Sequence, residues 1–163
     1  GAIKVSSRLM EGTRIRVLFP VADGGAAVNG EDPEKVATAW RGSGTALLVD
    51  DEEVVRAIGS RILQKLGFSV VVASDGHEAL EQFQQYRDDI RCVILDLTMP
   101  KMDGEECFRE LRRLDQDIPI IMARGYNEQE IAVRNVCIGM AGFIHKPFKI
   151  VTLREVLARA LGN

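Results

Sequence analysis

The stretch "TALLVDDEEVVR", residues 45–56, places two adjacent acids, Asp50 and Asp51, directly after an apolar run. The run itself, Ala46–Val49, has no polar side chain, as expected for a strand that is buried on both faces. After the acids, apolar residues recur at three- and four-residue steps across residues 54–66, which is the spacing of a helix. The stretch therefore predicts a buried strand, an acidic turn and a helix.

The same unit repeats along the rest of the chain. Helical spacing separates the apolar runs of strand length, and Asp75, Asp103 and Asn127 stand where helix caps are expected. A strand–helix unit repeated five times predicts an α/β fold with a parallel sheet covered on both faces. The expected strands are Ala46–Val49, Val70–Ala73, Cys92–Leu95, Ile118–Met122 and Gly142–Ile144.

Residues 1–44 have a different character. The stretches "GAIKVSS" and "TRIRVLFPV" within residues 1–20 predict a β-hairpin, and residues 21–44 have the composition of a linker, with a short helix expected over residues 33–40. A hairpin alone is marginal in water. Its apolar side should therefore seek cover from the sheet domain, which we expect over residues 45–163, or from a second copy of the chain in a homodimer. That side carries Ile3, Val5, Ile15 and Val17.

Composition excludes several classes of protein. A net charge of −3 over 163 residues argues against a nucleic-acid partner bound by bulk electrostatics. No apolar run approaches the ~20 residues of a membrane span, so we expect a cytoplasmic chain whose own residues make no membrane contact. The chain does not begin with Met, and we expect a piece of a longer protein, for which a membrane anchor outside this chain stays open. Three cysteines without C-x-x-C spacing are expected to be reduced core thiols: Cys92, Cys107 and Cys137.

Acids also follow the third expected strand, where "VILDLTMPKMDG" contains Asp96. Ligands of open parallel sheets bind beyond the carboxyl ends of the strands, so Asp50, Asp51 and Asp96 converge if the first and third strands are neighbours. Each pair then repels by about 4 kcal/mol at ~4 Å and an effective dielectric of about 20. A divalent cation removes that cost, and all-oxygen ligands favour Mg²⁺. The alternative is that Asp50 caps the next helix and Asp51 is solvated, but capping needs one acid only.

A cation is expected at the same edge. The segment "GFIHKPF" ends the fifth strand with Lys146, whose ammonium can reach an anion held by the metal. Pro147 makes a cis Lys146–Pro147 peptide bond possible, and such a bond would fix the direction of this side chain. Carboxylates, Mg²⁺ and Lys together indicate a phosphoryl-transfer site in which one carboxylate is the nucleophile.

The segments "LLVDDE", "VILDLTMPKMDG" and "HKPF", in this order and at this spacing, resemble the response-regulator receiver domain from residue 45 to about 161. The resemblance implies a flavodoxin-like (βα)5 sheet of strand order 2-1-3-4-5. It implies that Asp96 accepts a phosphoryl group from a histidine kinase or a histidine phosphotransfer domain. It further implies that Asp51, Asp96 and the Thr98 carbonyl ligate Mg²⁺, that Asp50 acts through metal-bound water, and that Lys146 pairs with the phosphoryl oxygens.

The chain departs from the family at the end of the fourth strand, where the usual Ser or Thr is Ala123. The missing hydroxyl removes a hydrogen bond to the phosphoryl group worth roughly 1.5–3 kcal/mol, so we expect the structural response to be weakened or rerouted. Arg124 either contacts the phosphate or is a solvated surface residue. Phe143, at the family's aromatic switch position, either switches or packs as an ordinary core residue.

The segment "GAIKVSSRLMEGTRIRVLFPV" resembles the last hairpin of a histidine-kinase ATP-binding domain, with Gly12 and Thr13 opening the final strand. The order of the parts then implies a bacterial hybrid sensor histidine kinase in a two-component phosphorelay. This chain contains no kinase motif, so its expected chemistry is limited to phosphorylation and dephosphorylation of Asp96. Two alternatives remain: a Mg²⁺-dependent aspartyl-phosphate phosphatase, which would need a second Asp where Thr98 stands, and a non-phosphorylated receiver-like interaction module.

Overall fold

The structure is a computed structural model that describes residues 2–8, 12–18, 40–125 and 139–162. The chain divides into two compact units, residues 1–38 and 39–163, which are treated separately below. None of the described helices is long and apolar enough to cross a membrane.

The second unit is built on a five-stranded parallel sheet of order β4-β3-β5-β6-β7. Counted within this sheet, the order is 2-1-3-4-5, which confirms the predicted flavodoxin-like topology. The strands are β3 (Thr45–Val49), β4 (Ser69–Ala73), β5 (Ile90–Asp96), β6 (Ile120–Arg124) and β7 (Gly142–His145).

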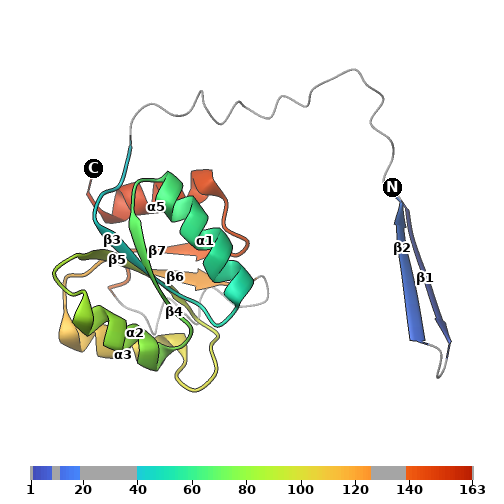
Figure 1. Cartoon of the computed structure of the whole chain (residues 1–163), viewed down its shortest axis with the longest axis horizontal. Coiled ribbons are helices and arrows are strands. Elements are labelled where there is room, and N and C mark those ends of the chain that lie inside the picture. Colours follow the sequence, from blue (N-terminus) through green and yellow to red (C-terminus); the bar gives the residue numbers. More distant parts are fainter. Residues whose placement is uncertain (1, 9–11, 19–39, 126–138, 163) are drawn as a thin grey trace. The chain divides into compact units, whose positions relative to one another are not determined.

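Helices cover both faces of the sheet (Figure 1). One face is covered by α1 (Glu53–Lys65) and α5 (Ile150–Ala160), and the other by α2 (Gly76–Gln85) and α3 (Gly104–Leu114). The predicted caps of α2 and α3 are confirmed, because Asp75 accepts a hydrogen bond from the Glu78 N–H and Asp103 from the Glu106 N–H. The expected cap Asn127 and the helix expected after it lie outside the described residues.

Side chains of each strand alternate between two apolar clusters. The cluster under α2 and α3 contains Val49, Leu95 and Met122, whereas the cluster under α1 and α5 contains Leu48, Ile94 and Ala123. Each fully buried Leu or Ile contributes roughly 1.5–3 kcal/mol. The alternation also decides where the polar strand ends point: a residue two positions after Leu48 or Ile94 lies on the α1/α5 face.

Two cysteines belong to these clusters as expected. Cys92 and Cys107 are free and fully buried, and burial raises the pKa of each thiol to about 12. Each is therefore a protonated core group. Cys137 lies outside the described residues.

All five strands differ from their predicted bounds by one or two residues at one end or at both, and two of these differences have a clear consequence or cause. β6 begins at Ile120 instead of Ile118, because Pro119 has no N–H for the ladder and the Ile118 N–H bonds to Asp115 Oδ1 at 3.0 Å. β5 extends to Asp96, which pairs with Ala123 of β6. The acid is therefore part of the sheet itself and is held by its backbone.

The linker predicted over residues 21–44 extends too far at its C-terminal end, because residues 40–44 contact the sheet unit. The Gly42 N–H donates to the Leu66 carbonyl at 2.9 Å, and the Trp40 ring lies 6.1 Å from the Phe68 ring, centroid to centroid. Covering the large apolar Trp40 ring stabilises this contact. Residues 40–44 thus belong to the sheet unit, while the helix expected over residues 33–40 falls almost entirely outside the described residues.

The first unit contains the predicted hairpin. β1 (Ala2–Arg8) pairs antiparallel with β2 (Gly12–Leu18), and Gly12 opens β2 with a φ of 96°, in the left-handed region that glycine tolerates. One face is apolar and exposed, with Ile3 at 71% and Ile15 at 63% of full exposure. The expected cover for this face stays a prediction. The other face is basic and carries Lys4, Arg8, Arg14 and Arg16.

Candidate functional site

Three carboxylates meet at the carboxyl edge of the sheet. β3 and β5 are neighbours, so Asp50, which follows β3, lies beside Asp96 at the end of β5. Ligand oxygens of Asp50, Asp51 and Asp96 lie within 4.8 Å of one another. Asp50 is fully buried and Asp96 is 2% exposed, whereas Asp51 is exposed. The structure therefore brings together the three acids that the sequence singles out.

Gly104, the first residue of α3, allows this convergence, and the sequence reasoning missed it. A Cβ at this position would lie 2.2 Å from the Asp96 carbonyl oxygen and 2.6 Å from the Leu97 Cα. The Gly104 N–H donates to the Leu97 carbonyl at 2.9 Å, which holds the start of α3 against the end of β5. The signal in the sequence is the glycine of "KMDG", placed one residue after the helix cap.

Lys146 completes the cluster from β7. Its Nζ lies 2.7 Å from Asp50 Oδ2 and 2.7 Å from Asp96 Oδ2, with 13% of the side chain exposed. Its backbone N–H donates to the Arg124 carbonyl at 2.9 Å, and the peptide bond to Pro147 is cis, as predicted. One ammonium thus bridges two buried carboxylates that come from different strands.

Burial controls the electrostatics of the site. It raises the pKa of Asp96 to about 6; the charge of Asp50 adds to this, whereas Lys146 and the Thr98 N–H act in the opposite direction. For Lys146, burial alone would lower the pKa, but hydrogen bonds to Asp50 and Asp96 outweigh it and raise the pKa. The lysine is therefore held charged, while ionised Asp96 is costly in the fold.

The residues at this edge fit a hard divalent cation. Asp50 Oδ1 accepts a hydrogen bond from the Glu52 N–H at 3.0 Å, which closes the turn before α1. It does not cap the helix, because the N-cap of α1 is Glu52 and no side chain caps this end, so the alternative that Asp50 caps the next helix is wrong. The buried Asp50 Oδ2 is approached by the Lys146 ammonium and accepts no hydrogen bond from any other group in the described part of the chain. Together with Asp51 and Asp96 it offers an all-oxygen ligand set of the kind that Mg²⁺ prefers. The turn contact thus accounts for one oxygen of Asp50 and leaves the rest of the cluster for a cation.

The acids open into a pocket of about 540 Å³. Asp96 and Lys146 reach it from the sheet, and Thr98 reaches it from the loop before α3. The pocket is lined by Asp51, Glu52, Val55, Asp96, Thr98, Gly125, Lys146 and Pro147.

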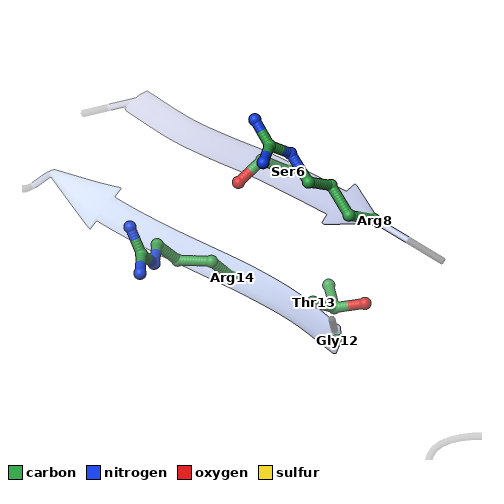
Figure 2. A pocket seen from close by; sticks show the side chains of 5 residues that line it. All are labelled: Ser6, Arg8, Gly12, Thr13 and Arg14. Carbon is green, nitrogen blue, oxygen red and sulfur yellow. The ribbon is translucent and has the colours of Figure 1, made fainter. Parts of the chain in front are cut away.

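A second hollow, of about 500 Å³, lies on the hairpin, where Ser6 and Arg8 of β1 face Arg14 of β2 (Figure 2). Gly12 and Thr13 complete its lining. All five residues are exposed, and none of them is a carboxylate. The chemistry expected of a phosphoryl site therefore belongs to the acidic pocket of the sheet unit.

The residues expected to switch lie on the two last strands. Ala123 is 1% exposed and pairs with Asp96 on one side and Ile144 on the other. Arg124 is 4% exposed, so the alternative of a solvated surface residue is wrong. Its guanidinium approaches His145 and Phe143 and is not part of the pocket lining.

Comparison with known proteins gives a consistent result. Residues 46–158 match the family model described as the response regulator receiver domain. Sensor kinase CckA of Brucella abortus is 35% identical over 169 residues, which cover 98% of this chain and 18% of the kinase. Chemotaxis protein CheY of Bacillus subtilis is 34% identical over 116 residues, or 71% of this chain and 95% of CheY. The chain thus spans less than a fifth of the kinase but nearly the whole length of the smaller relative.

Solved structures agree with this result. CheY4 of Vibrio cholerae superposes with a TM-score of 0.66 at 32% identity, covering 74% of this chain and 100% of that one. A CheX–CheY–BeF₃–Mg²⁺ complex from Borrelia burgdorferi gives a TM-score of 0.67 at 28% identity, covering 74% of this chain and 90% of that one. The likeness covers the sheet and its helices, the part of the chain that carries the acidic pocket.

Proposed function

Because this chain belongs to the response regulator receiver domain family of two-component signalling, we propose that it accepts a phosphoryl group on Asp96 from a phosphohistidine, in a reaction that requires Mg²⁺. The observation that carries the proposal is the position of Asp96. Its carboxylate is nearly buried, lies 2.7 Å from a lysine ammonium, and forms part of the wall of an open pocket with two further acids beside it.

The roles of the residues follow from this arrangement. An Asp96 carboxylate oxygen attacks phosphorus; the phosphorus–nitrogen bond of the donor breaks, and the leaving imidazole nitrogen keeps the electron pair. Lys146 stands where it can neutralise the phosphoryl oxygens. Its contact with Asp96 also favours the ionised, nucleophilic form of the acid, against the effect of burial.

We propose that the Mg²⁺ ligands are the carboxylates of Asp51 and Asp96 and the carbonyl of Thr98, with Asp50 acting through metal-bound water. A bound Mg²⁺ would supply positive charge to the transferring group and offset the repulsion among the acids. The three carboxylates within 4.8 Å and the position of Thr98 on the pocket wall support this ligand set. The related CheY structure is described as a complex with BeF₃ and Mg²⁺, which supports a Mg²⁺ site in this domain but does not name its ligands.

The phosphohistidine donor is proposed to dock on the rim of the pocket. Val55 and Pro147 line the pocket, and large apolar side chains stand exposed beyond them on α1 and α5. Exposed apolar side chains beside a site favour a protein partner. The donor is then a histidine kinase or a histidine phosphotransfer domain. The exposed apolar residues of these two helices are Val54, Ile58, Ile150 and Val151.

We further propose that the chain is part of a cytoplasmic region of a hybrid sensor histidine kinase. The alignment with sensor kinase CckA covers 98% of the chain, hairpin included. The hairpin is then the end of the ATP-binding domain, and its exposed apolar face would pack on the rest of that domain.

The test is phosphorylation by a small donor. The full chain and its Asp96→Asn variant are incubated with acetyl phosphate, with and without Mg²⁺. The mass of each intact protein is then measured by mass spectrometry. The expected result is one phosphoryl group on the wild type with Mg²⁺, and none on the variant. Equal incorporation into the variant would refute the assignment of Asp96. No incorporation into the wild type would favour the interaction module, and sustained hydrolysis of phosphate monoesters would favour the phosphatase.

A further inference from the structure

We propose that Arg124 is a positioning residue that holds Phe143 and the end of β7 in place, and that it couples β6 to β7 on the face of the sheet opposite to Ala123. The proposal rests on the proposed function, because it concerns how the same phosphoryl site would be read by the rest of the domain.

The contacts of Arg124 join two strands. Arg124 ends β6 and pairs in register with His145 of β7, and its Nη2 lies 3.0 Å from His145 Nε2. Since an arginine nitrogen can only donate, the histidine nitrogen accepts this hydrogen bond. The guanidinium carbon lies 5.8 Å from the centroid of the Phe143 ring, within the range of a cation–π interaction. Arg124 itself is 4% exposed, whereas Phe143 is half-buried and His145 is exposed, so the buried guanidinium restrains Phe143 from the inner side of the ring pair.

Arg124 also connects residues whose side chains lie on opposite faces of the sheet. Ala123 belongs to the cluster under α1 and α5, the face on which Asp50, Asp96 and Lys146 lie, so the next side chain points to the opposite face. Phe143 packs against that opposite cluster. The backbone carbonyl of Arg124, however, accepts the Lys146 N–H at 2.9 Å. One residue thus contacts the phosphate-facing lysine through its backbone and the aromatic ring through its side chain.

This arrangement predicts how the domain responds. A phosphoryl group can shift the structure only through contacts that differ between two states. If Lys146 moves toward the phosphoryl oxygens, the end of β7 moves with it, and the contacts of Arg124 with His145 and Phe143 must change. Arg124 therefore favours the resting arrangement. Its removal should release Phe143 and make binding of a phosphoryl mimic easier.

The experiment follows Phe143 directly by ¹⁹F NMR of the full chain labelled with 4-fluorophenylalanine. The sequence has six phenylalanines, and a Phe143→Leu variant assigns the resonance. Arg124→Met removes the charge and the donors at similar length, and His145→Ala removes the acceptor from an exposed position. Arg112→Met is the matched control, because the Arg112 guanidinium lies 5.2 Å above the Phe108 ring on α3.

Without any ligand, we expect the Phe143 resonance to shift or broaden in Arg124→Met several times more than in Arg112→Met, and in the same direction but less in His145→Ala. An unchanged Phe143 resonance in both Arg124→Met and His145→Ala would overturn the proposal. If Arg124→Met fails to fold, Arg124→Lys and His145→Ala decide by the same criterion, since the lysine keeps the charge but not the planar group that reaches both partners.

Beryllofluoride with Mg²⁺ then tests the link to the site. We expect it to bind about fivefold more tightly to Arg124→Met than to the wild type, because the variant loses the cation–π contact with Phe143 and the hydrogen bond to His145 from the resting state. Equal or weaker binding would overturn the coupling. If beryllofluoride binds neither protein, the proposed function fails, whereas the ligand-free Phe143 resonance still decides whether Arg124 positions the ring.

Discussion

Replacing Asp96 by Asn should stabilise the protein at neutral pH, although it removes the proposed phosphoacceptor. Burial raises the pKa of Asp96 from its ordinary 3.8 to about 6, so the folded state holds the proton more tightly than the unfolded state does. Each decade of proton affinity is worth 1.36 kcal/mol, and keeping Asp96 ionised in the fold therefore costs about 3 kcal/mol. Asn has nearly the same shape and no charge, so it should recover most of this free energy.

The stabilisation produced by Asp96→Asn should increase as pH rises. Below pH 3.8, Asp96 is protonated in both the folded and the unfolded state and contributes no difference. Between pH 3.8 and about 6, the unfolded state has lost its proton while the folded state retains it, so the free energy of unfolding falls as pH rises. The stabilisation by Asn should therefore be close to zero near pH 4 and about 3 kcal/mol at pH 7.5.

Urea unfolding in the presence of EDTA measures this difference at the two pH values. Trp40, the single tryptophan of the sequence, packs against Phe68 of the sheet unit and provides the fluorescence signal. Asp103→Asn is the matched control: it makes the same chemical change at a helix cap in the neighbouring loop, where Asn caps as well as Asp, so its effect should stay within about 1 kcal/mol. An Asp96→Asn variant that is no more stable than the wild type at pH 7.5, or equally stabilised at both pH values, would refute the reasoning.

Three further predictions concern the metal, the packing of α3 and the domain boundary. Asp51→Asn should lower Mg²⁺ affinity in calorimetric titration more than Asp50→Asn does, because Asp51 is the proposed direct ligand; an equal or reversed loss counts against the ligand set. Gly104→Ala should lower the free energy of unfolding by about 1–3 kcal/mol and weaken Mg²⁺ binding, because its Cβ would meet backbone atoms of Asp96 and Leu97. Gly125→Ala should change stability little, because no atom of the described residues lies within 4 Å of the added Cβ. Removing residues 1–38 should leave cooperative urea unfolding of the sheet unit intact. Removing residues 1–44 should lower its free energy of unfolding by roughly 1–3 kcal/mol, because the Trp40–Phe68 and Gly42–Leu66 contacts are lost. Loss of cooperativity in the shorter deletion would show that the hairpin is integral to the fold.

The sequence by itself determined the features that depend on near neighbours in the chain. The alternation of apolar runs and helical spacing predicted the five strands in their order, and short polar patterns predicted the caps Asp75 and Asp103. Strand ends share one edge in a parallel sheet, so the sequence predicted that Asp50 and Asp96 converge if the first and third strands are neighbours, and the strand order meets this condition. These predictions succeeded because each follows from local geometry combined with one topological rule.

Tertiary structure alone decided how groups that are distant in sequence meet. Nothing in the spacing of residues shows that the Lys146 ammonium lies 2.7 Å from two carboxylates, that Trp40 covers Phe68, or that Arg124 turns away from the pocket toward Phe143. The raised pKa of Asp96 likewise comes from burial by surrounding elements. The physical reason is that solvation and contact distance are set by the packing of whole strands and helices against one another, which no short stretch of sequence specifies.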